Sequence, residues 1–109
     1  MVLMEQLVLN YLKTNAVGKA NAVKSGEIEK RFGIYGEHLR GAINGLRTDG
    51  YPICSGRNGY WYAETVEELI ATRNNLKQRI EGIERALGGI ENAIFNGTAI
   101  KKTKLNGGN

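Results

Sequence analysis

The fold is decided by residues 25–62, which read SGEIEKRFGIYGEHLRGAINGLRTDGYPICSGRNGYWY. This stretch predicts a short helix, a tight turn, a second helix that ends at a glycine, and then a β-hairpin. Ile28 and Phe32, four residues apart, mark the buried side of the first helix. We expect Ser25 to be the N-cap of that helix, and Gly33 to adopt the left-handed conformation that ends it.

The second helix is predicted over residues 35–49. Its apolar side chains follow one another at steps of four and three, which places them on one face: Leu39, Ile43 and Leu46. Gly50 is the expected C-cap, and Pro52 prevents the helix from continuing.

The hairpin is expected to pair 51–55 with 60–63 through the turn 56–59. Glycine and asparagine in this turn supply the positive φ angles that a tight hairpin needs. Cys54 is interpreted as a small buried residue of the first strand. In the returning strand, two tyrosines alternate with Trp61, so one face should be buried and the other exposed. Three roles are open for Trp61: stacking on a nucleic acid, packing against the next helix, or meeting a partner.

Before this stretch, residues 2–14 predict an amphipathic helix, and 15–24 predict a polar loop in which Val23 makes a brief strand contact. The expected apolar face of the helix consists of Leu3, Leu7, Val8 and Tyr11.

After the hairpin, a long helix is predicted over residues 66–94, with Thr65 and Glu68 forming a capping box at its start. From Leu76 onward its apolar residues alternate at steps of four and three, the repeat of a coiled coil. The expected dimerisation residues are Leu69, Leu76, Ile80, Ile83, Leu87, Ile90 and Ile94. This stripe must be covered, either by a second copy or by folding back on the front domain as a monomer. We expect a homodimer. In a parallel pair Arg79 would oppose Glu84 of the second copy, but the orientation stays open.

Charge divides the chain of 109 residues into three parts. Residues 1–63, the expected DNA-binding domain, carry eight Lys/Arg and five Asp/Glu, a net +3. Residues 64–96, the expected coiled-coil helix, carry four Lys/Arg and six Asp/Glu, a net −2. Residues 97–109, the expected flexible tail, carry three lysines and no acid, a net +3. A basic front domain and tail favour polyanionic partners, although many cytosolic proteins share such a balance.

Composition and motifs argue against several classes. No apolar run approaches the roughly 18 residues of a membrane span, and the start lacks the features of a signal peptide. The lone Cys54 cannot form an internal disulfide, which suits the cytoplasm. His38 is the only histidine, and no metal-ligand cluster, phosphate-cradling glycine motif or paired-carboxylate pocket stands out. We therefore expect no enzyme activity, no cofactor and no metal.

The polar face of the second predicted helix is the best candidate for reading DNA. Arginine can bind guanine through two hydrogen bonds and asparagine can bind adenine in the same way, so Arg40 and Asn44, four residues apart, suit base contacts. The alternative is a solvated polar face. At the hairpin tip Arg57 either contacts a phosphate or is an ordinary turn residue. The expected DNA-binding residues are Lys19, Lys24, Tyr35, Glu37, His38, Arg40, Asn44, Arg47, Arg57 and Asn58.

Two local motifs point to a particular family of winged-helix proteins: LRTDG at residues 46–50 and GYWY at residues 59–62. With them, residues 1–63 resemble the winged-helix domain of the biotin-operon repressor and related bacterial regulators. The resemblance implies an α+β fold, a winged helix-turn-helix of three helices and a β-hairpin wing, followed here by the coiled-coil helix. It also implies contacts to double-stranded DNA from residues 35–44 and from the wing. That family usually starts its recognition helix with Ser or Thr, where Tyr35 stands here.

The repressor's ligase domain is absent, so biotin and ATP do not carry over. We expect a small dimeric transcriptional regulator whose second predicted helix, residues 35–49, enters the major groove. The alternative is a winged-helix protein-interaction factor, either an accessory protein of replication or assembly or an inhibitor of another complex.

Overall fold

The computed structural model describes residues 3–97 of the chain. It is an α+β structure that divides into two compact units, one ending at Asn74 and the other starting at Asn75. The described elements are α1 (Met4–Asn15), the 3₁₀ turn η1 (Lys19–Asn21), α2 (Ser25–Phe32), α3 (Gly36–Thr48), β1 (Ile53–Gly56), β2 (Gly59–Tyr62) and α4 (Val66–Phe95). This order is compatible with a winged helix-turn-helix followed by a long helix.

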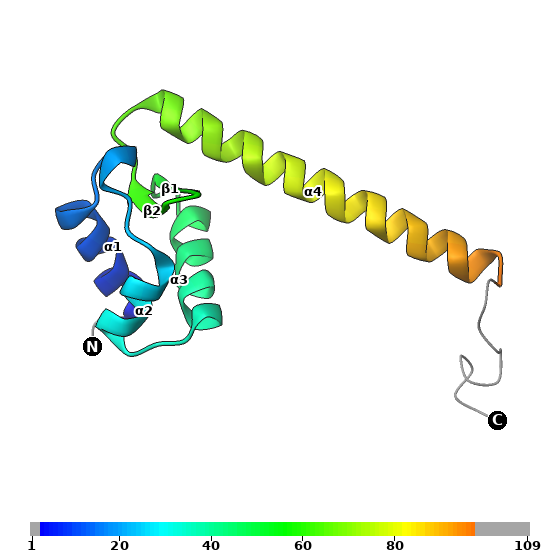
Figure 1. Cartoon of the computed structure of the whole chain (residues 1–109), viewed down its shortest axis with the longest axis horizontal. Coiled ribbons are helices and arrows are strands. Elements are labelled where there is room, and N and C mark those ends of the chain that lie inside the picture. Colours follow the sequence, from blue (N-terminus) through cyan, green and yellow to red (C-terminus); the bar gives the residue numbers. More distant parts are fainter. Residues whose placement is uncertain (1–2, 98–109) are drawn as a thin grey trace. The chain divides into compact units, whose positions relative to one another are not determined.

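The first unit has one core, which α1, α2, α3 and the hairpin build together (Figure 1). The prediction for α3 is confirmed, because its three predicted apolar residues are buried, with Ala42 beside them. In α1 the buried residues are Val8, Leu9 and Leu12, whereas Leu3 and Leu7 are exposed. The prediction that Leu3 and Leu7 lie on the buried face was wrong, because the helix turns a neighbouring stripe toward α3.

The prediction for α2 is confirmed in length but not at its start. The N-cap position is Lys24, and no side chain caps the helix, so the prediction of Ser25 as N-cap was wrong. Gly33 ends the helix in the left-handed conformation, with φ +62°, as predicted. The α2 helix is tied to α1 by aromatic contacts: the rings of Tyr11 and Phe32 meet edge to face at 5.8 Å.

The predicted tight turn at 56–59 is confirmed. Gly56 pairs with Gly59 at the end of the ladder, so both residues of this pair also belong to the strands. Gly59 has φ +117°, and the space where a Cβ would stand is occupied by the Val23 carbonyl. Val23 and Tyr60 exchange two backbone hydrogen bonds of 2.9 Å, which confirms the predicted strand contact of Val23. A glycine at position 59 is therefore needed for both the turn and the close approach of the backbone.

The first turns of α4 belong to the first unit. Thr65 caps the helix, since its Oγ1 accepts a hydrogen bond of 3.2 Å from the Glu68 amide. Trp61 is buried, and its indole nitrogen donates to the Glu68 carboxylate at 3.0 Å. Thr72 is buried, and its side chain is hydrogen-bonded to the side chain of Cys54. Of the three roles considered for Trp61, packing against the helix is confirmed.

The second unit contains the rest of α4, whose apolar residues are largely exposed. Ile80 is 54% exposed, Ile83 69% and Leu87 55%. Ile90 and Ile94 are exposed to a similar degree, and Leu76 is partly buried. The basic tail predicted at 97–109 lies, apart from Gly97, outside the described residues.

Candidate nucleic-acid interface

The outer face of α3 is exposed and polar. Because the apolar side of α3 packs on the core, the opposite side faces solvent along the whole helix. Arg40 and Asn44 are both exposed and lie one turn apart on this face. The exposed predicted residues on α3 and at its start are Tyr35, Glu37, His38, Arg40 and Asn44. Tyr35 is the N-cap rather than the first helical residue, and its side chain is 86% exposed.

Two glycines shape this face. Among the residues that the structure describes, none lies within 4 Å of the position that a Cβ on Gly41 would take, and the α3 backbone is exposed there. At Gly36 the corresponding position is flanked by Nη1 of Arg40 at 3.2 Å and by a carboxylate oxygen of Glu29 at 3.5 Å. The guanidinium of Arg40 thus lies near the start of α3, with an acidic side chain of α2 close by.

Gly45, by contrast, serves the packing of α3 on α1. A Cβ at this position would overlap the carboxylate of Glu5, which belongs to α1. A side chain at position 45 would displace this flexible carboxylate of α1, whereas a Cβ at position 41 would meet none of the described residues.

Arg47 holds α3 to the hairpin instead of extending from the polar face. Its Nε donates to the carbonyl oxygen of Ile53 at 2.9 Å, and its Nη2 donates to Oγ of Ser55 at 2.9 Å. The side chain is partly buried. We therefore assign Arg47 a structural role and leave it out of the candidate interface.

A second group of predicted residues gathers beside the hairpin tip. Lys24 donates from Nζ to the carbonyl oxygen of Arg57 at 3.2 Å, which places an ammonium group next to the turn. Lys19, Lys24 and Asn58 line one hollow of about 310 Å³, together with Glu27 of α2. Four predicted contacts, from the loop before α2 and from the wing, are thus close in space: Lys19, Lys24, Arg57 and Asn58.

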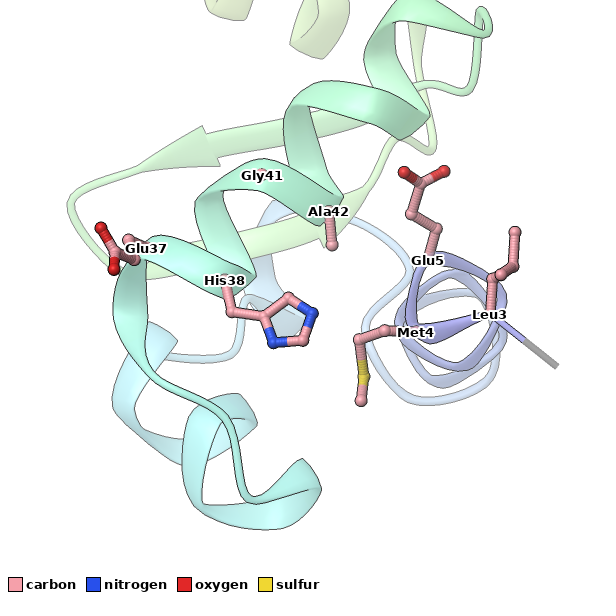
Figure 2. A pocket seen from close by; sticks show the side chains of 7 residues that line it. All are labelled: Leu3, Met4, Glu5, Glu37, His38, Gly41 and Ala42. Carbon is pink, nitrogen blue, oxygen red and sulfur yellow. The ribbon is translucent and has the colours of Figure 1, made fainter.

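A shallow groove of about 430 Å³ lies between α1 and α3 (Figure 2). His38 points from α3 toward Met4 of α1. Glu37 and Gly41 also line this groove. Two of the predicted DNA-binding residues, Glu37 and His38, thus border the groove between α1 and α3.

Hydrogen bonding shifts the pKa of one group near the wing. The pKa of Glu68 is lowered mainly because its carboxylate accepts from the Glu64 amide at 2.9 Å, with further bonds from the Lys19 amide and from Trp61. This carboxylate therefore joins the loop that carries Lys19 to the start of α4. In β1, burial raises the pKa of the Cys54 thiol, so the thiol stays protonated and unreactive.

Sequence reasoning missed two residues here. Thr48 is exposed one turn after Asn44, and its hydroxyl donates to the Asn44 carbonyl at 2.8 Å. The four-residue spacing alone would have placed it on the same face. Glu27 was not among the predicted residues, and its position beside Lys19 and Lys24 depends on a long-range contact that no local pattern reveals.

Among residues 3–97 no group of three His, Cys, Asp or Glu side chains could hold a metal ion. Within the same residues, no helix has both the length and the apolar character needed to cross a membrane. Comparison with known protein families, with curated proteins and with solved structures finds no match to this chain.

Proposed function

We propose that the chain is a cytoplasmic winged helix-turn-helix protein that binds double-stranded DNA in a sequence-specific way and acts as a small dimeric transcriptional regulator. Its α3 helix enters the major groove, and Arg40 and Asn44 read base edges. The wing and the adjacent loop contact phosphates through Lys19, Lys24 and Arg57. Such phosphate contacts set the position of the protein, and the α3 contacts set its sequence preference.

The observation that carries this proposal is the exposed face of α3. A guanidinium and a carboxamide, the two groups best suited to bidentate base contacts, stand one turn apart with no covering element. Gly41 lies on the same outer face, beside Asn44, with open space at its Cβ position. A helix interior that keeps a glycine loses about 1 kcal/mol relative to alanine, and close approach of a ligand to the backbone is a reason to keep it.

The cluster beside the hairpin supports the same proposal. Lys24 and Arg57 come from separate parts of the chain, and a hydrogen bond joins them at the turn. Two exposed cations at this turn suit the phosphate backbone next to a helix in the groove. The acidic Glu27 nearby would limit how closely a phosphate approaches Lys19.

The proposed dimer rests on α4. Its exposed isoleucines and leucines repeat at coiled-coil spacing, and a single helix gains little stability in water without a covering partner. The apolar stripe of α4 would form the contact between the two copies, which we call the seam. Replacing Ile83 by Asp places a charge in the seam, so light scattering should find a monomer where the unchanged chain is a dimer. An unchanged mass would refute the seam.

The DNA-reading role is tested by Arg40→Ala combined with Asn44→Ala. We expect the pair to abolish sequence preference in fluorescence anisotropy, with discrimination between related duplexes falling by about 1–3 kcal/mol per lost contact. The matched control is Arg73→Ala with Asn74→Ala, which removes the same two side-chain types from an exposed part of α4. If duplex binding and preference survive the α3 pair, the alternative of a protein-interaction factor is favoured instead.

A further inference from the structure

We propose that the α4 helices of two copies of this chain pair antiparallel, in a register centred on Arg85. This inference rests on the proposed dimer and adds its orientation. In this register residue n of one copy faces residue 170 − n of the other. Each layer of the seam then pairs a residue of one copy with a residue of the other. Three such pairs occur, each of them twice in the dimer: Leu76 with Ile94, Ile80 with Ile90, and Ile83 with Leu87.

The composition of the seam argues against a parallel pair. With Ile80 at heptad position a, positions d are filled by Leu76, Ile83 and Ile90. Parallel two-stranded coils prefer leucine at d, and isoleucine there shifts the preference toward other assemblies. In an antiparallel pair each layer combines an a residue of one copy with a d residue of the other, so no layer places two d isoleucines against each other.

Arg73, at the heptad position a before Ile80, also favours the antiparallel pair. In a parallel pair, Arg73 would face Arg73 of the second copy inside the seam, where two like charges repel. In the antiparallel register it would instead face position 97, beyond the last residue of α4, Phe95. Its guanidinium would then remain at the edge of the dimer, in solvent.

Charges beside the seam are complementary in this register. Lys77 and Glu91 are both exposed, and each occupies heptad position e. Equivalent e positions of antiparallel helices lie next to each other, so Lys77 of each copy meets Glu91 of the other. Ala86 lies at the dyad on the opposite side of the seam, where its small side chain lets the helices approach closely. The Glu84 side chains of the two copies meet as one like-charge pair, which is exposed and weak.

Disulfide cross-linking of the full chain without DNA distinguishes the two orientations. Ala86→Cys should form a covalent dimer under mild oxidation, since the two positions face each other across the dyad. Ile90→Cys should not, because its two copies lie about 15 Å apart along the axis, whereas a parallel pair would hold them in contact. The unchanged chain, with only the buried Cys54, is the control.

Covalent dimers from Ile90→Cys and none from Ala86→Cys would overturn the proposal, as would a monomer by light scattering for the unchanged chain. Charge reversal gives an independent check. Lys77→Glu should weaken dimerisation about two- to 30-fold, and adding Glu91→Lys should restore it. Failure to restore would contradict the register. Because no DNA is present, loss of the proposed DNA binding would leave all of these results unchanged.

Discussion

Replacing Gly41 by alanine separates the stability of α3 from its proposed contact with DNA. The Cβ position of this residue is open, so the added methyl group meets none of residues 3–97 in the free protein. Alanine is more favourable than glycine in a helix interior by about 0.8–1.0 kcal/mol. The variant should therefore be more stable than the unchanged chain, with a melting temperature higher by about 4–8 °C.

The same methyl group would stand beside Asn44, on the outer face of α3 that is proposed to enter the major groove. Forcing one extra carbon into a closely packed contact costs about 1–3 kcal/mol, which corresponds to about five- to 150-fold weaker binding. Calorimetry and fluorescence anisotropy measure the two effects on the same preparation. Gly26→Ala is the matched control, because its Cβ position on α2 is equally open and lies off the proposed interface. If Gly41→Ala binds DNA as tightly as the unchanged chain, the backbone of α3 does not approach DNA there.

Three further predictions concern the hairpin. Gly59→Ala should destabilise the protein by about 1–3 kcal/mol in urea denaturation, because the new Cβ collides with the Val23 carbonyl and φ is positive; unchanged stability would refute that account. The pKa of Glu68 is lower in the folded chain than its ordinary value near 4.5, so the ionised carboxylate stabilises the fold above pH 4.5. This stabilisation is lost as the pH falls from 4.5 toward the pKa of the folded state. Acidification should therefore progressively weaken the packing of Trp61. Indole fluorescence measures this loss, and Glu68→Gln should reduce its pH dependence; an equal dependence in the variant would contradict the assignment. Arg57→Ala should lower the slope of log binding constant against log salt by about one, and an unchanged slope would remove the wing from the interface.

Local patterns predicted most elements of the fold. The apolar spacing of α3, the glycine after α2 and the capping box of α4 each depend on neighbours within four residues, and all three predictions are confirmed. The apolar stripe of α1 was misplaced because its alternatives, beginning at Leu3 or at Met4, are both apolar. Only packing against α3 decides between them. The close contact of the Val23 carbonyl with Gly59 joins distant parts of the chain, so no local pattern revealed it.

The candidate site was predictable to a similar degree. Exposure of Arg40 and Asn44 followed from the buried positions of the same helix, because the two faces of a helix are fixed by one period. Arg47 was predicted to be a DNA-binding residue of that face, and its hydrogen bonds to Ile53 and Ser55 were not predicted. That engagement depends on where the hairpin packs, and helical spacing carries no such information.

The proposed DNA reading by α3 is tested most directly by selection from a randomised duplex library at physiological salt, run in parallel for the unchanged chain and for Arg40→Ala with Asn44→Ala. We predict that the unchanged chain enriches a defined motif and that the variant does not. Enrichment of the same motif by both proteins, or of none by the unchanged chain, would contradict the proposal.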